Sequence, residues 1–293
     1  MTQKPQFINN INQISYRYQY FIFDIWGVIH DGESAYDGVL EVIKYLRSKN
    51  KKICFVSNAP RRKFVVAKLL EKFGIGEDLY DFVITSGEVT FLKLQENQEN
   101  GFKKLGSNYL YIGPKKDEDL LHGLNYNIVQ NASHADFVIN TGFDNDNSSE
   151  DEKLSQIKEC AKHNLMMICV NPDLKVVKKD GRSMNCAGLI AKQYQELGGK
   201  VEYYGKPYPA IYEIACNLFN TSQKSSLIAI GDGLETDILG ALNNKIDSLL
   251  ITGGLLSNFF KIKYWQDCDP KKLDNLCKEQ NIFPNYIISN LKL

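Results

Sequence analysis

The 293-residue sequence lacks several features that mark whole classes of protein. It has no run of about 18 apolar residues, the length of a membrane-spanning helix, and Asp24 interrupts its most apolar early stretch, residues 18–29. Its 35 Lys and Arg balance its 35 Asp and Glu, so the basic excess of a general nucleic-acid binder is missing. It also has no internal repeats and no low-complexity tracts. These absences argue against membrane, nucleic-acid-binding and fibrous classes.

Secretion is not indicated either. The first 17 residues are polar and rich in Asn and Gln, without the charged and then apolar segments of a signal peptide. The 7 cysteines are odd in number and scattered, which favours reduced thiols over a disulfide framework. Hydrophobic residues make up 43% and charged residues 24%, as in ordinary globular proteins. We therefore expect a cytoplasmic α/β protein with neither a membrane nor a nucleic acid as its partner.

What the sequence does contain is an alternation of short apolar runs and helical patterns. Apolar runs at 21–23 and 53–56 flank a segment, 39–46, whose apolar residues lie on one helical face. The same order recurs late, with a helical pattern at 210–219 and an apolar run at 227–230. A strand–helix–strand unit of this kind requires a right-handed crossover and a parallel sheet.

The middle of the chain predicts a second unit. The segment 85–88, Thr-Ser-Gly-Glu, fits a capping box that opens a helix just after a strand. Further strand candidates follow at 109–112, 137–140 and 166–170. We place the boundaries near Glu88 and near the Gly-Gly-Lys segment 198–200, which leaves about 110 residues between them, enough for a domain.

The predicted architecture is therefore a discontinuous α/β core with a parallel sheet, interrupted by an inserted α/β domain. The core comprises residues 1–88 and 200–293, and the inserted domain comprises residues 89–199.

Polar residues stand where the predicted core strands end, the edge at which parallel sheets bind ligands. Asp24 follows the run 21–23, the Ser57-Asn58 pair follows the next strand, and the acidic loop 231–237 follows the run 227–230. A fourth site is Lys206, which stands between a glycine and a proline on a stiff loop. Each signal alone fits ordinary capping or solvation, but their order and spacing together are specific.

Taken in order, these four motifs resemble the haloacid dehalogenase (HAD) superfamily of phosphatases. The long insert between Ser57 and Lys206 is similar to that of its class IIA branch, which includes phosphatases of nucleotides, sugar phosphates and pyridoxal phosphate. The resemblance extends from Tyr20 to about Gly254, and it includes the segments 85–87, 171–173 and 252–253. It implies a Rossmann-like core with a C2-type cap.

The resemblance assigns a role to each acidic residue of the motifs. Asp24 would be the nucleophile that attacks phosphorus and forms an aspartyl-phosphate. One Asp24 oxygen, the Asp232 carboxylate and the backbone carbonyl of Trp26 would hold Mg²⁺, and Asp237 would support that shell and orient the lysine. The implied cofactor is therefore magnesium.

The resemblance also assigns the groups around the substrate, a small phosphorylated metabolite. Ser57 and Asn58 would bind the phosphoryl group, and Lys206 would neutralise its charge. We also predict a substrate pocket formed by Arg61, Asn171, Asp173 and Tyr208. Ion pairing, capping or simple packing is an alternative for these residues. Caps of this branch often form dimer contacts, so a homodimer through the cap is an open expectation.

The sequence departs from the phosphatase pattern at one position. The phosphatase motif is Asp-x-Asp, and its second Asp protonates the leaving group, whereas Trp26 occupies that position here. A positioned acid contributes about 10²- to 10⁴-fold, so its loss weakens hydrolysis without abolishing phosphoryl transfer. His30 and Asp31 are conceivable substitutes, but the stronger expectation is that they shape the turn before Gly32.

Three functions remain open. An aromatic residue at the position of Trp26 is most similar to the haloacid dehalogenases, which need no Mg²⁺. Asp232 and Asp237, however, would repel Asp24 unless a cation lay among them, which favours metal-dependent phosphoryl chemistry. We therefore predict a Mg²⁺-dependent phosphatase with unusual leaving-group chemistry. The alternatives are a catalytically weak, phosphate-binding regulatory protein and a dehalogenase-like hydrolase.

Overall fold

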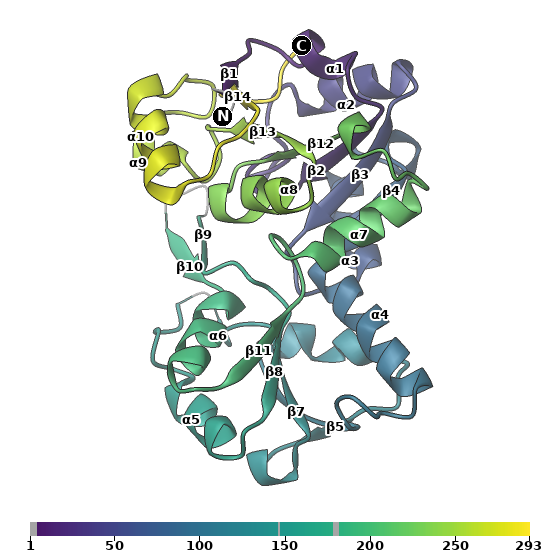
Figure 1. Cartoon of the computed structure of the whole chain (residues 1–293), viewed down its shortest axis with the longest axis vertical. Helices are drawn as coiled ribbons and strands as arrows, with labels where there is room; N and C mark the ends of the chain where they lie inside the picture. Colours follow the sequence, from purple (N-terminus) through teal and green to yellow (C-terminus); the bar gives the residue numbers. More distant parts are fainter. Residues whose placement is uncertain (1–4, 146, 178–181) are drawn as a thin grey trace.

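The computed structural model describes residues 5–145, 147–177 and 182–293. They form two lobes, each built on a parallel sheet, and the chain passes from one lobe to the other and back (Figure 1). The C-terminus lies at the end of the larger lobe that faces away from the smaller one (Figure 1). Among the described residues, no helix has the length and apolar character needed to cross a bilayer.

The larger lobe, the core, contains a seven-stranded sheet in which every pairing is parallel. Its strands are, in spatial order, β1 (Gln6–Phe7), β14 (Tyr286–Ile288), β13 (Asp247–Ile251), β12 (Leu227–Gly231), β2 (Tyr20–Asp24), β3 (Lys52–Ser57) and β4 (Phe82–Thr85). The strand order reverses between β2 and β12. In open α/β sheets, the carboxyl edge at such a point is where ligands bind.

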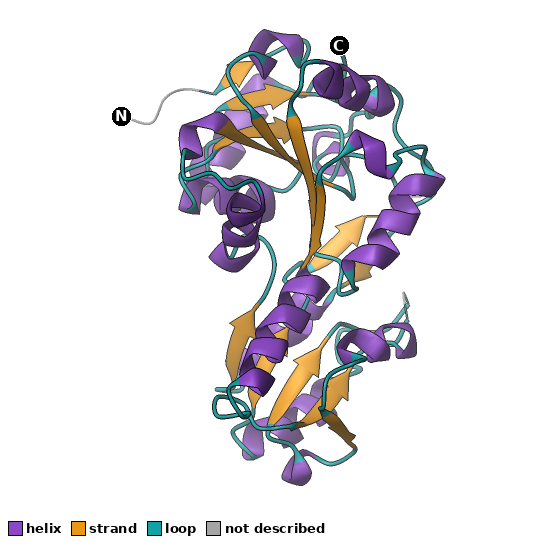
Figure 2. Cartoon of the chain, turned by 90° about the vertical axis from the view of Figure 1, so that its right-hand side faces the viewer, coloured by secondary structure: helices purple, strands orange, loops and turns teal. Residues whose placement is uncertain are grey.

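Helices cover both faces of the core sheet (Figure 2). They are α1 (Asn12–Ser15), α2 (Val39–Ser48), α3 (Lys63–Lys72), α7 (Pro209–Leu218), α8 (Leu239–Asn243), α9 (Ser257–Phe260) and α10 (Pro270–Gln280). Phe21 and Phe23 of β2 pack on the face of α1 to α3, while Ile22 packs on the face of α7. Strands buried on both faces are the near-continuous apolar runs seen in the sequence.

The smaller lobe, the cap, contains a five-stranded parallel sheet. Its strands are β11 (Lys200–Tyr203), β8 (Met166–Cys169), β7 (Phe137–Asn140), β5 (Asn108–Ile112) and β6 (Asn127–Val129). The helices of this lobe are α4 (Ser86–Glu99), α5 (Leu154–Lys162) and α6 (Ala187–Glu196). An antiparallel pair, β9 (Lys175–Val177) and β10 (Ser183–Asn185), extends toward the core (Figure 1).

The predicted fold class, a Rossmann-like α/β core with an inserted α/β cap, is confirmed. The predicted start of the second core segment at residue 200 falls one strand early, because β11 pairs with β8 in the cap sheet, Lys200 opposite Met166. The chain therefore leaves the cap after Tyr203. Alternating apolar residues at 201 and 203 follow the boundary glycines, and only the pairing shows which sheet they join.

Two strands near one edge of the core sheet, β1 and β14, were not predicted. Strand β1 has only two residues, within a segment whose composition is polar, and strand β14 lies beyond the last motif. Each forms through pairing with a distant strand, so local patterns carry little sign of it.

The predicted capping box is half present. Thr85 accepts a hydrogen bond from the Glu88 N–H at 2.9 Å, but the Glu88 carboxylate pairs with Arg62 instead.

Candidate active site

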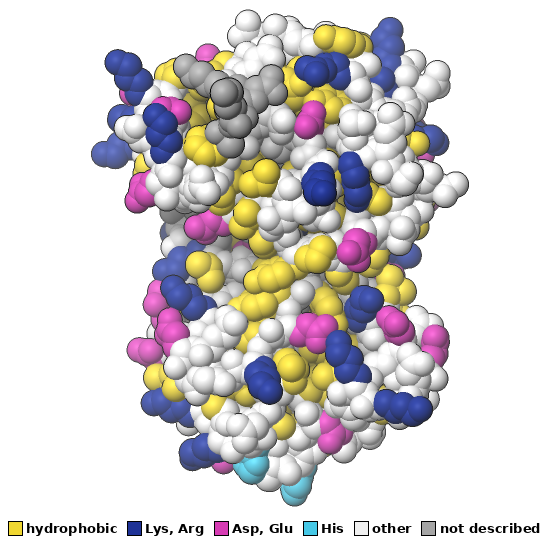
Figure 3. All heavy atoms as spheres, viewed as in Figure 1, with side chains coloured by type: hydrophobic (Ala, Val, Ile, Leu, Met, Phe, Trp, Pro, Cys, Tyr) yellow, Lys and Arg dark blue, Asp and Glu magenta, His cyan; other side chains and the backbone are white. Residues whose placement is uncertain are grey.

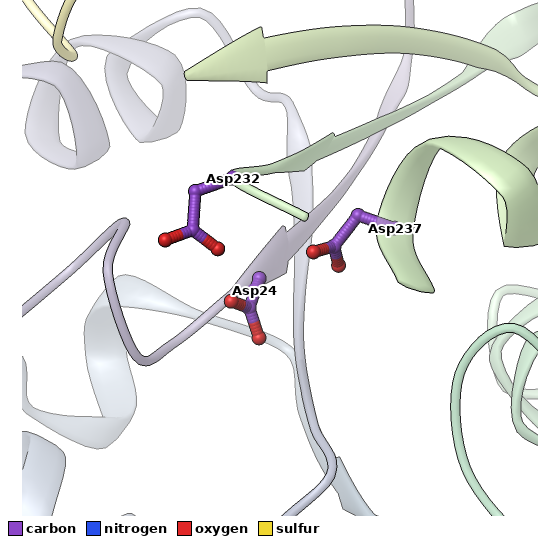
Figure 4. A group of neighbouring side chains, drawn as sticks. All are labelled: Asp24, Asp232 and Asp237. Carbon is purple, nitrogen blue, oxygen red and sulfur yellow. The ribbon is translucent and has the colours of Figure 1, made fainter. Parts of the chain in front are cut away.

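Three aspartates meet at the carboxyl edge of the core sheet, where the strand order reverses. Asp24 is the last residue of β2, Asp232 directly follows β12, and Asp237 lies in the short π-helix η5 (Leu234–Ile238). Their side chains point toward one another (Figure 4), and one oxygen from each lies within 4.8 Å of the others. All three are at most 8% exposed. The sheet topology thus assembles the carboxylates that the sequence places over 200 residues apart.

One lysine belongs to this cluster. The Lys206 ammonium donates hydrogen bonds to Asp24 Oδ1 and to Asp237 Oδ1, the latter at 2.7 Å. Burial lowers the pKa of Lys206, but the carboxylates of Asp237 and Asp24 outweigh burial and hold that pKa well above its usual value. Lys206 is therefore charged at neutral pH, and a single ammonium faces three carboxyl groups.

The excess of carboxyl groups over ammonium groups contributes to raised pKa values in this cluster. Burial raises the pKa of Asp24 well above its usual value, and Asp237 and Asp232 add to the rise while Lys206 opposes it. Burial also raises the pKa of Asp232 to about 7, and Asp237 acts in the same direction. Buried carboxyl groups that repel one another lose this penalty when a cation binds among them.

The residues present fit a magnesium ion. Their donors are carboxylate oxygens, the ligand type that this hard cation prefers. Asp232 is held in place by its neighbours, because the Leu255 N–H donates to its Oδ2 at 2.6 Å. A Cβ atom at Gly27, where φ is +82°, would lie 1.9 Å from the same oxygen. Only glycine leaves room for the Asp232 carboxylate there.

The predicted phosphate-binding pair lies at the end of β3, beside this cluster. Ser57 and Asn58 are 8% and 4% exposed, and Ser57 Oγ accepts a hydrogen bond from the Ala59 N–H at 3.2 Å. A proline such as Pro60 suits the first turn of a helix, but here it lies ahead of the helix. Helix α3 starts at Lys63, because residues 58–62 form a loop that packs against the start of α4.

Asn58 joins three parts of the chain. Its Nδ2 donates to Asp173 Oδ1 at 2.8 Å and to the Lys206 carbonyl at 3.1 Å, and its Oδ1 accepts from the Lys206 N–H at 2.7 Å. The sequence predicted a role for Asn58 at the phosphoryl group and for Asp173 at the substrate. The hydrogen bond between Asn58 and Asp173 had no signal in the sequence.

A cleft of about 1990 Å³ separates the lobes, and it contains the aspartate cluster. The predicted pocket residues Arg61, Asn171, Asp173 and Tyr208 all line it. All four also contact protein groups, and the contact of Asp173 is the hydrogen bond from Asn58. Asn171 Oδ1 accepts from the Asp173 N–H at 3.0 Å, and the Tyr208 ring stacks on Tyr203 with centroids 4.7 Å apart. The Arg61 guanidinium pairs with the buried carboxylate of Asp117 at 2.8 Å.

Asp117 was missed at the sequence level. It stands in a charged run, residues 115–119, which has the composition of a solvated surface. Only its ion pair with Arg61 of the core shows that this cap residue is buried at the contact between the lobes.

Trp26 lines the cleft and packs edge-on against His30, with ring centroids 5.3 Å apart. His30 is 1% exposed, and its Nδ1 accepts from the Gly32 N–H at 2.9 Å. Burial lowers the pKa of His30 to about 4, so its imidazole is neutral at pH 7. Asp31 Oδ1 accepts from the N–H groups of Glu33 and Ser34. These contacts support a turn-shaping role for His30 and Asp31.

Two segments of this chain match models of known protein families. Residues 21–127 match the model of the haloacid dehalogenase-like hydrolases, and residues 203–259 match a second model, described as HAD-hydrolase-like. The two segments include all four motifs, from Asp24 to Asp237. The chain belongs to the haloacid dehalogenase-like hydrolases.

Individual relatives agree with this membership. The sugar-phosphatase AraL of Bacillus subtilis is 28% identical to this hydrolase over 238 residues, which are 79% of this chain and 82% of that protein. A haloacid dehalogenase-like hydrolase from Brucella suis superposes with a TM-score of 0.81, covering 97% of this chain and 99% of that chain at 29% identity. The predicted family and enzyme class, a HAD-type phosphatase, are confirmed.

A third neighbour shows the same fold with a metal bound. The glycerol phosphate phosphatase of Mycobacterium tuberculosis, solved in complex with magnesium, superposes with a TM-score of 0.69 at 20% identity. The match covers 94% of this chain and 76% of that chain.

Proposed function

We propose that this hydrolase is a Mg²⁺-dependent phosphatase that transfers the phosphoryl group of a small phosphorylated metabolite to Asp24 and then to water. The observation that carries this proposal is the buried cluster of Asp24, Asp232 and Asp237 at the carboxyl edge, where the Lys206 ammonium binds Asp24 and Asp237 and is the one cation that the described residues place against the cluster. A dehalogenase-like reaction would leave the excess of carboxylates without a purpose.

In the first step, an Asp24 oxygen attacks phosphorus and the bond between phosphorus and the leaving oxygen breaks. In the second step, water attacks the aspartyl-phosphate, phosphate leaves, and Asp24 is regenerated. Ser57 Oγ would donate to a phosphoryl oxygen, and the Lys206 ammonium would offset charge that builds up on the phosphoryl group.

Magnesium would be held by Asp24, Asp232 and the backbone carbonyl of Trp26, with Asp237 beside them. When bound, it supplies positive charge that keeps the carboxylates ionised and draws the phosphoryl group toward them. The magnesium in the structural neighbour from Mycobacterium tuberculosis supports this choice of cation.

Trp26 sets the leaving-group chemistry. Its indole N–H is a donor with no proton to give at neutral pH, and the neutral imidazole of His30 is already tied to the turn. Leaving groups that depart without protonation are therefore the best substrates, while poor leaving groups lose the help of an acid. The sugar-phosphatase relative makes sugar phosphates the first natural compounds to assay.

The test compares an activated aryl phosphate with a sugar phosphate, with and without Mg²⁺. We expect Mg²⁺-dependent turnover of the aryl ester, much weaker turnover of the sugar ester, and loss of both in Asp24→Asn. Activity that is independent of Mg²⁺ and survives in Asp24→Asn would refute the proposal.

A regulatory, phosphate-binding protein is the second candidate, and Trp26 is the observation that favours it. Its signature would be Mg²⁺-dependent binding of inorganic phosphate without turnover of either ester. Calorimetric titration of phosphate beside the hydrolysis assay separates the two candidates.

A further inference from the structure

The catalytic lysine lies on the second connection between the lobes. Lys206 follows the last cap strand, β11, by three residues and precedes helix α7 of the core by three. Its ammonium reaches Asp24 and Asp237, both of which belong to the core. Because the connecting segment joins two lobes, a change in the seating of the cap pulls on the backbone that carries this ammonium.

Asn58 holds that backbone from the core side. Both the N–H and the carbonyl of Lys206 bind the Asn58 side chain, at 2.7 and 3.1 Å, and Asn58 is 4% exposed. The backbone at Gly205, next to Lys206, packs closely against Asn58 and Pro172. Gly205 has a φ of +137°, and a Cβ atom there would lie 2.7 Å from Asn58 Oδ1 and 2.8 Å from Pro172 Cδ. The end of β3, the connection and the cap loop at 171–173 therefore meet at one point.

The third hydrogen bond of Asn58 reaches the cap. Its Nδ2 donates to the Asp173 carboxylate, and the backbone of Asp173 is anchored by the cap around it. The Asp173 N–H donates to Asn171 Oδ1 at 3.0 Å, and its carbonyl accepts from the Gly188 N–H of α6 at 3.1 Å. A Cβ atom at Gly188 would lie 2.2 Å from the Pro172 carbonyl. Asp173 therefore moves with the cap.

We propose that Asp173 is a positioning residue, which acts through Asn58 to couple the seating of the cap to the placement of the Lys206 ammonium. This inference rests on the proposed function. With the cap seated, the Asp173 carboxylate binds the Asn58 amide, the amide holds both backbone groups of Lys206, and the ammonium lies between Asp24 and Asp237. When the cap lifts, Asp173 leaves with it, and the Asn58 side chain is free to rotate away from Lys206.

The kinetic test uses the full-length protein, an activated aryl phosphate and a sugar phosphate. Asp173→Ala should lower kcat about 10- to 100-fold on both esters, with KM changed less than about 3-fold, because Lys206 acts on the phosphoryl group that the esters share. Asp173→Asn, which keeps an acceptor oxygen toward Asn58, should recover most of the loss. A loss confined to one ester, or one expressed in KM, would show a substrate contact and overturn the inference.

The matched control is Asp136→Ala. Asp136 is also a cap aspartate that accepts backbone N–H groups, those of Ser107 and Asn108, and these contacts lie within the cap. We expect its kcat to equal that of the wild type. A fall in kcat as large as that of Asp173→Ala would mean that any disturbance of the cap suffices, and the inference would fail.

A second readout does not depend on activity. In protein labelled with ¹⁵N-lysine, the Lys206 amide resonance should shift and its hydrogen exchange should accelerate in Asp173→Ala but not in Asp136→Ala. An unchanged Lys206 amide would overturn the inference. If the wild type hydrolysed neither ester, the proposed function would fail, while this amide measurement would still decide the coupling.

Discussion

Aspartates at the two ends of the core sheet have opposite electrostatic surroundings. At the amino end, Asp81 precedes β4 and binds Arg47 at 2.7 Å, Lys52 at 2.9 Å and the Ile53 N–H at 2.9 Å. Burial raises the pKa of Asp81, but these donors outweigh burial, and the pKa lies below its usual value. At the carboxyl end, three carboxyl groups share Lys206, and the pKa values of Asp24 and Asp232 are raised.

The difference lies in the ratio of donors to carboxylates, since the residue types are the same. One carboxylate with two cations and a backbone N–H is a satisfied structural group. Three carboxylates with one cation are a site that requires a further positive charge, and such imbalance is typical of functional sites. We therefore expect substitutions at the amino end to change stability and substitutions at the carboxyl end to change catalysis.

The largest effect is expected from matched Asp→Asn substitutions at the two ends. Asp24→Asn should lower kcat by at least about 10³-fold, because it removes the proposed nucleophile, with little change in folding. Asp81→Asn should keep kcat and lose about 1–3 kcal/mol of unfolding free energy, because its ion pairs and hydrogen bonds are weakened. Steady-state kinetics and urea denaturation of both variants measure the contrast, and an equal loss of kcat in the two would abolish it.

Trp26→Asp should sharpen the contrast by adding an acid at the carboxyl end. We expect turnover of the sugar phosphate to rise about 10- to 100-fold, while that of the aryl phosphate changes little, because only the poorer leaving group needs a proton. The ratio of kcat/KM for the two esters is the measurement. Trp26→Phe is the control, and a similar rise in that variant would point to steric relief instead.

Acid should act on the carboxyl end in two opposite directions. The pKa of Asp232 is raised to about 7, so its protonation in the folded protein adds stability as pH falls. His30 acts the other way, because its pKa is about 4 in the folded protein and 6.5 when unperturbed, so between these values the unfolded chain binds more protons and stability falls as pH falls. The full loss from His30 alone is about 3 kcal/mol. Asp81 has a lowered pKa, so its contribution persists until the pH falls below the ordinary carboxyl range.

Urea denaturation at pH 7 and pH 4.5 measures this difference. His30→Asn, which keeps an acceptor for the Gly32 N–H and cannot be protonated, should show a smaller acid loss than the wild type. The same loss in both proteins would remove His30 as its cause.

The smallest expected effect is on the Tm of the metal-free protein, which two Asp→Asn substitutions should change in opposite directions. Asp232→Asn should raise Tm in the presence of a chelator by about 2–4 °C per kcal/mol of repulsion relieved, whereas Asp81→Asn should lower it. Added Mg²⁺ should then raise the Tm of the wild type and hardly that of Asp232→Asn. A metal-free Asp232→Asn that is less stable than the wild type would contradict the excess of negative charge.

Much of this molecule follows from local patterns. The buried strands β2, β3 and β12 are apolar runs, and each ends at a polar residue that the structure places at one edge. The boundary at β11 was predicted one strand too early, and α3 starts at Lys63 although Pro60 suits the first turn of a helix. In both cases a local preference, the glycine pair or Pro60, was outweighed by pairing and packing with distant segments.

The side chains that end each strand follow from the sequence alone, since burial and turn chemistry are properties of short segments. The family can also be recognised from the sequence, because the order and spacing of the motifs are visible without a structure. The tertiary structure alone decided what these side chains touch. Lys206 and Asp24 are 182 residues apart and Asn58 and Asp173 are 115 apart, and no periodicity reaches so far. The repulsion among the aspartates and the hydrogen bonds between Asn58 and Lys206 exist only once the sheets have formed and the cap is seated on the core.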